Sequence, residues 1–119
     1  MSYWYLASPY AKYPHGKEKA VEHIAENAAL LIRNNIQIFC PILHSQAVKP
    51  FLPEDLRDDH SFWLSFDKHF IDHSWGVIVC KLDSWHESKG IAEEMEYCLF
   101  RHRPVIFMEP GIVPDFFLG

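Results

Sequence analysis

The sequence predicts one three-layer α/β domain, residues 1–119, in which a parallel sheet of four to five strands carries helices on both faces. Three observations lead to this prediction. The chain has 119 residues, which is the size of a single domain. Short apolar runs alternate with segments of helical period, an order typical of parallel sheets. The run Trp75–Cys80 is continuously apolar, as in a central strand covered on both faces. The expected architecture is therefore flavodoxin-like or Rossmann-like.

The first third of the chain predicts a strand, a helix and a second strand. Tyr3–Ser8 is a short apolar run rich in aromatic residues and stopped by Pro9, which favours a buried strand. Lys17–Asn34 has apolar residues on one face of a 3.6-residue period and charged residues on the other. Asparagine tolerates a left-handed conformation, so the Asn34-Asn35 pair ends this helix. Ile36–Pro41 is a second apolar run and predicts the second strand.

The remaining elements continue the alternation after a break. Ile42–Asp59 contains several prolines and predicts a long loop, a kind of segment that is often functional. His60–Asp72 has the period of a helix, and Trp75–Cys80 forms the third strand. Ser88–His102 predicts a further helix, and Pro104–Met108 a further strand.

The composition argues against a nucleic-acid polymer or a membrane as a partner. Eleven basic and sixteen acidic residues give a net charge of −5, whereas binding a phosphate backbone requires a basic stripe. No apolar run approaches the ~20 residues of a membrane-spanning helix. The opening residues Met1–Leu6 lack the basic start and apolar stretch of a signal peptide. Because Cys40, Cys80 and Cys98 fall in apolar segments, we expect a cytoplasmic protein with reduced core cysteines.

Two carboxylates project onto the apolar faces of predicted helices. At about 100° per residue, Asp67 lies about 40° from Trp63, inside the apolar stripe of their helix. In the next helix Glu94 lies about 60° from Ile91, at the edge of the apolar face, and the neighbouring glutamates point away. An ionised carboxylate that faces a core is costly unless it is paired or opens onto a cavity.

Asp67 and Glu94 are therefore candidate catalytic residues, with a structural alternative. Burial raises the pKa of a carboxyl group, which suits proton transfer near neutral pH. Two carboxylates at one edge of a sheet also resemble the acid and nucleophile of glycoside chemistry. In the alternative, both are half-buried and pair with a lysine, arginine or histidine. Periodicity alone leaves both interpretations open.

The carboxyl ends of the predicted strands supply candidate binding residues, because ligands of open parallel sheets bind there. Ser8, Pro9 and Tyr10 follow the first strand, and His44 follows the second. Gly90 lies one helical turn before the inward-facing glutamate and allows a ligand to approach the backbone closely.

Four motifs along the chain carry a resemblance to a known family. They are Tyr5–Tyr10, Cys40–Ser45, Asp67 on the helix that follows, and Leu82–Glu94. Together they resemble the nucleoside 2-deoxyribosyltransferase superfamily. The likeness is closest to a small, functionally unassigned branch with a Trp-x-x-Ser-x-Gly-x-x-x-Glu signature, which here is formed by Trp85, Ser88, Gly90 and Glu94.

The resemblance implies a role for each matching residue. Glu94 attacks the anomeric carbon of a 2-deoxyribosyl N-glycoside, and Asp67 assists proton transfer or positions the nucleophile. Ser88 contacts a 5′-phosphate, and the segment Ser8–Tyr10 lines the sugar and phosphate. The loop after the first strand lacks the arginine and glycines of the monophosphate hydrolases, which leaves phosphate recognition open. The resemblance also implies a homodimer or larger homo-oligomer, with a neighbouring subunit often completing the pocket.

We therefore expect an N-glycosidase or deoxyribosyltransferase that acts on a nucleoside, a deoxynucleoside or a 5′-monophosphate and uses no cofactor or metal. Glu94 is the nucleophile, and its apolar surroundings keep Asp67 partly protonated. Trp63, Trp85 or Tyr10 offers a ring face for the base, with core packing as the alternative. The rival from another class is a sensor that binds a nucleotide or an NAD derivative without turning it over.

Overall fold

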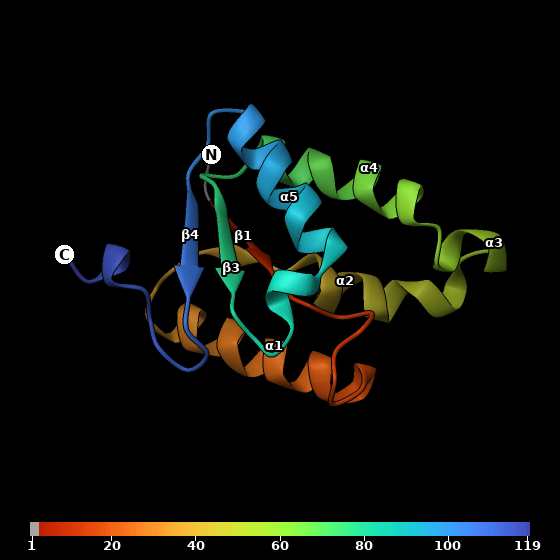
Figure 1. Ribbon diagram of the computed structural model, residues 1–119, viewed down its shortest axis with the longest axis horizontal. Coiled ribbons are helices and arrows are strands. Elements are labelled where there is room, and N and C mark those ends of the chain that lie inside the picture. Colours follow the sequence, from red (N-terminus) through yellow and green to blue (C-terminus); the bar gives the residue numbers. More distant parts are fainter. Residues whose placement is uncertain (1–2) are drawn as a thin grey trace.

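The computed structural model describes residues 3–119 and has the predicted α/β architecture (Figure 1). Met1 and Ser2, the first residues of the opening segment discussed above, lie outside the described part of the chain. Within the described part the sheet has four strands, all parallel, in the order β2-β1-β3-β4. The strands are β1 (Trp4–Ala7), β2 (Ile38–Phe39), β3 (Val77–Cys80) and β4 (Val105–Met108).

Helices cover both faces of the sheet, as Figure 1 shows. Helix α1 (Lys17–Arg33) packs on one face, and helices α4 (His60–Asp72) and α5 (Lys89–Phe100) pack on the other. Because strand side chains alternate between faces, Leu6 joins the core beneath α1, while Tyr5 and Ala7 join the core beneath α4 and α5. This alternation places the Tyr5 side chain on the same face of the sheet as both candidate carboxylates.

The connections change direction next to β1. The chain passes from β1 through α1 to the edge strand β2 and then crosses to β3 on the other side of β1. In an open parallel sheet such a switch point leaves a crevice outside the carboxyl ends of the strands. The crevice therefore lies beyond Ala7 and Cys80, where β1 and β3 end.

The prediction of a long loop over 42–59 is wrong, because most of this segment is helical. It contains α2 (Pro41–Val48), the 3₁₀ turn η1 (Lys49–Phe51) and the short helix α3 (Glu54–Arg57). The prolines that suggested a loop stand where helices accept them. Pro41 is the first residue of α2, where its missing N–H costs no hydrogen bond, and Pro53 precedes the first turn of α3.

The other predicted boundaries agree with the structure to within a few residues. Helix α4 has the bounds predicted for it, and Ser88 caps α5 by accepting a hydrogen bond from the Ile91 backbone N–H at 3.2 Å. Asn35 has the left-handed conformation, with φ of 62°, that the sequence predicts at the end of α1. Two further 3₁₀ turns are η2 (Trp85–Glu87) and η3 (Asp115–Phe117).

The three cysteines are buried and free, which confirms the prediction that they belong to the core. Between residues 3 and 119 the chain has no helix with the length and apolar character needed to cross a membrane.

Candidate active site

A cavity of about 300 Å³ lies at the carboxyl ends of the strands, at the switch point of the sheet. Its walls come from the loop after β1, the N-terminus of α2, one face of α4 and the first turns of α5. Seven of the nine residues predicted as site residues line it, namely Ser8, Pro9, Tyr10, Asp67, Ser88, Gly90 and Glu94. The structure thus brings the two inward carboxylates together in one hollow.

Glu94 is the more deeply placed of the two acids. It lies in the second turn of α5, three residues after the buried Ile91, and only 9% of the residue is exposed. Asp67 projects from the middle of α4, the neighbouring helix on the same face of the sheet, and is partly buried. The helical projection therefore identified two carboxylates that do turn inward, and the structure adds that they share a cavity.

Tyr5 connects the two acids from below. It is fully buried in β1, and its hydroxyl donates a hydrogen bond to Oε2 of Glu94. The same hydroxyl lies close enough to Asp67 to lower the pKa of that carboxyl group. A phenol hydroxyl has one proton to donate but also accepts hydrogen bonds, so it can bridge an ionised Glu94 and a protonated Asp67.

Both carboxyl groups bind protons more tightly than ordinary acids. The pKa of Glu94 is raised from 4.5 to about 8, mainly by burial and to a smaller extent by the negative charges of Asp67 and Glu93. Burial likewise raises the pKa of Asp67 from 3.8 to about 6. The Tyr5 hydroxyl opposes both increases. The pKa of Tyr5 lies well above its usual 10, because it is buried beside two acids, so its hydroxyl keeps its proton.

The order of these pKa values differs from the expectation that Asp67 carries the proton. Glu94 is the more buried of the two, so desolvation penalises its ionised form more strongly. In the free protein the more buried Glu94 therefore keeps its proton to a higher pH than Asp67 does.

Removing the Tyr5 hydroxyl is expected to make Glu94 a weaker acid. Tyr5→Phe deletes the hydrogen bond that stabilises the ionised carboxylate, so the pKa of Glu94 moves further upward. The measurement is a ¹³C NMR titration of the Glu94 side-chain carboxyl carbon. Tyr97→Phe is a matched control, because the Tyr97 hydroxyl also donates to a carboxylate, Oδ1 of Asp72 at 2.7 Å, on the outer side of α5. An unchanged Glu94 titration in Tyr5→Phe would mean that the bridge has no electrostatic role.

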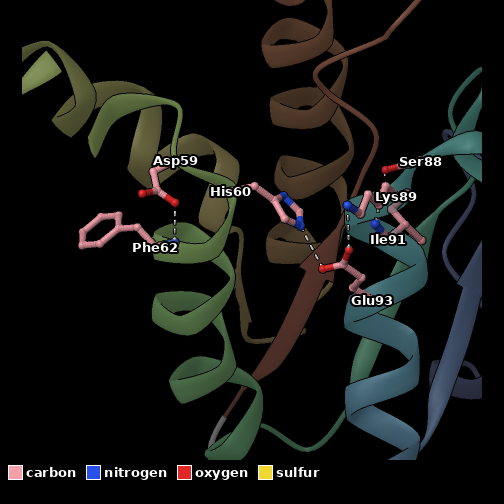
Figure 2. A network of polar contacts seen from close by, with 7 residues as sticks. All are labelled: Asp59, His60, Phe62, Ser88, Lys89, Ile91 and Glu93. Atoms are coloured by element: carbon pink, nitrogen blue, oxygen red, sulfur yellow. Dashed lines mark hydrogen bonds and ion pairs between the residues drawn. The ribbon is translucent and has the colours of Figure 1, made fainter. Parts of the chain in front are cut away.

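The N-terminal ends of α4 and α5 contribute His60 and Lys89 to the cavity wall, and polar contacts connect the two helices there (Figure 2). His60, at the start of α4, forms a 2.9 Å hydrogen bond between its Nε2 and Oε2 of Glu93 on α5. Lys89 Nζ lies 3.8 Å from the other oxygen of the same carboxylate. Glu93, which the sequence places away from the core, therefore ties the two helices together at the rim.

The structure places His44 and Trp85 away from the cavity wall. His44 is exposed on α2, and its ring stacks on Phe66 with 6.0 Å between the centroids. Trp85, in η2, packs against Phe107 of β4 at 5.5 Å, with Lys81 Nζ over its ring. A role for either residue in binding substrate stays a prediction.

Sequence reasoning missed Tyr5 as a polar member of the site. It lies inside a run that reads as core, but a hydroxyl within a strand covered on both faces needs a polar partner. This need for a polar partner was the feature of the sequence that could have identified Tyr5. Ala11, Ile42 and Leu64 also line the cavity, and they carry no recognisable signal because their side chains are apolar.

The second cavity and the possible metal sites are less well supported as functional sites. On the α1 side of the sheet there is a wider and more open hollow of about 750 Å³, lined by Tyr13, His23 and Arg33 among others, and it contains none of the predicted residues. Among residues 3–119, no group of three or more His, Cys, Asp or Glu side chains is arranged to hold a metal ion.

The comparisons with known proteins give a family without an assigned activity. No curated protein matches the chain. A family described as "Domain of unknown function (DUF1937)" matches residues 2–110, which include every strand and every residue of the cavity. With this match over most of its length, the chain belongs to the DUF1937 family.

Proposed function

We propose that this protein cleaves an N-glycosidic bond, as a hydrolase or as a deoxyribosyltransferase, in a nucleoside, a deoxynucleoside or a 5′-monophosphate. The observation that carries the proposal is that Asp67 and Glu94 line one cavity, with the buried Tyr5 hydroxyl hydrogen-bonded to Glu94, and that the pKa values of the two carboxyl groups are raised to about 6 and about 8. Two neighbouring carboxyl groups that share one proton near neutral pH supply the proton donor and the nucleophile that such a reaction needs.

The reactive form has its single proton on Asp67 and an ionised Glu94. This form is the minor one in the free protein, and the bridging Tyr5 hydroxyl offers a route by which the two acids exchange the proton. Positive charge develops at the anomeric carbon in the transition state and stabilises an ionised carboxylate beside it. Substrate thus favours the distribution of charge that the reaction requires.

The proposed reaction has two steps. An oxygen of Glu94 bonds to the anomeric carbon while the bond from that carbon to the base nitrogen breaks, and Asp67 gives its proton to the departing base. Water, or a second base in a transferase, then attacks the anomeric carbon and releases Glu94 as a carboxylate. A proton passes to Asp67 from the attacking water in hydrolysis, or from the attacking nitrogen of the second base in transfer, so the site is restored.

The walls of the cavity suit a flat base and a single sugar. Tyr10 and Trp63 line the cavity, and hydrogen bonds from the Tyr10 hydroxyl to Gln46 Oε1 and from Trp63 Nε1 to the Arg57 carbonyl, both 2.7 Å, hold their rings in place. A fixed ring face stacks on many bases. A volume of about 300 Å³ is at the small end of the range for small-molecule sites, as expected for one nucleoside.

A direct test measures free base released from a panel of nucleosides, 2′-deoxynucleosides and their 5′-monophosphates, separated by chromatography. The proposal expects release from at least one member of the panel. If members of the panel raise the melting temperature but none yields free base, the protein is a sensor rather than an enzyme. If neither effect is seen, the proposal is wrong.

Gly90 provides a prediction about the size of the cavity. A Cβ at this position would meet the Ser88 Oγ at an ordinary 3.8 Å, and alanine favours a helix over glycine by about 0.5–1 kcal/mol, so Gly90→Ala is expected to fold at least as stably. Because Gly90 lines the cavity, the added methyl group narrows the space for substrate, and we expect KM to rise about tenfold. Steady-state kinetics measure KM, and a thermal melt of the same preparation measures the stability. An unchanged KM would mean that the substrate does not bind next to Gly90.

A further inference from the structure

Lys49 is a largely buried cation at the outer wall of the cavity. It begins the η1 turn, in the segment that the sequence predicted to be a loop, and 21% of its side chain is exposed. Its Nζ lies 5.5 Å from the ring centroid of Tyr10 and 5.6 Å from that of Trp63. Both rings line the cavity, so two cation–π contacts hold the ammonium group behind the cavity wall.

The ion pair that Lys49 forms at the surface is weak. Its Nζ lies 3.8 Å from Oδ1 of Asp58, whose side chain is 85% exposed. Exposed carboxylates at this distance contribute little, because water screens the interaction. A cation that is mostly shielded from water is stabilised by any further negative charge in its surroundings.

Asp67 is a partly buried carboxylate on the same cavity wall as the two rings that Lys49 contacts. It lies four residues after Trp63 on α4, which places both side chains on the same face of the helix, and both line the cavity. Burial raises the pKa of Asp67, whereas the positive charge of Lys49 lowers it, with a smaller effect than that of the Tyr5 hydroxyl.

We infer that Lys49 is a positioning residue of the site, whose ammonium, held over the Tyr10 and Trp63 rings, stabilises the carboxylate that Asp67 becomes when it gives up its proton. Under the function proposed above, on which this catalytic meaning rests, Lys49 makes Asp67 a stronger acid toward the departing base. The effect on Asp67 itself does not depend on any reaction.

The groups around Asp67 come from several elements. The groups that influence the ionisation of Asp67, or are influenced by it, are Tyr5 on β1, Lys49 on η1 and Glu94 on α5. Further charged or titratable residues on the cavity wall are Tyr10, Lys12, His60, Glu87 and Lys89. Around the Lys49 ammonium the structure places the Tyr10 and Trp63 rings, the Asp58 carboxylate and, over the same Tyr10 ring at 5.5 Å, the ammonium of Lys17.

Lys17 provides a matched control. It makes the same cation–π contact with Tyr10 as Lys49 does, but it is exposed on the first turn of α1 and does not line the cavity. Lys17→Met and Lys49→Met each remove one ammonium from the Tyr10 ring and change the net charge equally. Only Lys49→Met removes a charge that acts on Asp67.

The experiment is a ¹³C NMR titration of the Asp67 carboxyl carbon in the full chain, without substrate. We expect Lys49→Met to raise the midpoint by about half to one pH unit, Lys49→Arg to restore it, and Lys17→Met to leave it unchanged. A thermal melt confirms folding, and Lys49→Gln replaces Lys49→Met if the latter does not fold. An unchanged midpoint in the folded variant, or an equal shift in Lys17→Met, overturns the inference.

This titration separates failure of the inference from failure of the proposed function. If the midpoint moves as expected but no base is released from any substrate, the electrostatic role of Lys49 stands and the glycosidic function fails. If base is released and the midpoint does not move, the function stands and the role assigned to Lys49 is wrong.

Discussion

Glu94→Gln is expected to lower the rate of base release by about 10³-fold or more, the scale of loss when a nucleophile is removed. The glutamine side chain has nearly the same shape and still accepts the hydrogen bond from the Tyr5 hydroxyl. It cannot form an ester with the sugar, and it carries no charge to stabilise the developing cation. The loss therefore falls on kcat. Initial rates of base release, measured with the substrate found in the panel, check this expectation.

The control for this prediction lies on the same helix. Glu96 is exposed on α5 and does not line the cavity, so Glu96→Gln makes the same chemical change outside the site. Its kcat is expected to equal that of the unmodified protein. Retention of a normal rate by Glu94→Gln would remove Glu94 from the mechanism.

The same Glu94→Gln substitution is expected to stabilise the fold at alkaline pH. The folded protein holds the Glu94 proton up to about pH 8, whereas the unfolded chain loses it near pH 4.5, so stability falls as the pH rises through this range. Above pH 8 the buried carboxylate costs up to about 5 kcal/mol, and glutamine removes that cost. Asp67, whose pKa is raised to about 6, changes stability in the same direction over a lower range.

Melting temperatures between pH 5 and pH 9 measure this effect. Near pH 5 we expect Glu94→Gln and the unmodified protein to melt at similar temperatures, and near pH 9 we expect the variant to melt at least about 5 °C higher. The Glu96→Gln control is expected to follow the unmodified protein at every pH, because its carboxylate is exposed. A constant difference between Glu94→Gln and the unmodified protein across the range would show that Glu94 titrates like an ordinary carboxylate.

The parts of the fold with a regular period could be predicted from the sequence. Helix α4 has its predicted bounds, and the same period showed that Asp67 and Glu94 turn inward. This works because a helix fixes the direction of every side chain relative to its neighbours. The continuous apolar run before Cys80 likewise identified the central strand β3.

The parts without a period could not be predicted in the same way. Helix α2 is short and has no clear apolar face, so the prolines at its start and beyond its end dominated the prediction, although Pro41 occupies a position that helices accept. Because that segment was taken as a loop, nothing placed Lys49 near Asp67. Tyr5 was missed because burial inside an apolar strand conceals which polar group its hydroxyl meets.

The relation between the two acids depends on contacts between distant parts of the chain. Tyr5 and Glu94 are 89 residues apart in sequence, and only the packing of α5 on β1 brings them together. Local sequence gives the direction of each carboxylate but not the depth of its burial. For this reason the higher pKa of Glu94 emerged only from the structure.

The most direct test of the account is mass spectrometry of the protein quenched with acid during its first turnover of a 2′-deoxynucleoside or its 5′-monophosphate. If Glu94 attacks the anomeric carbon, the peptide that contains Glu94 gains the mass of one deoxyribosyl group (or its phosphate), and the Glu94→Gln variant gains nothing. Turnover with the Glu94 peptide unmodified, or with the sugar attached to another residue, would contradict the account.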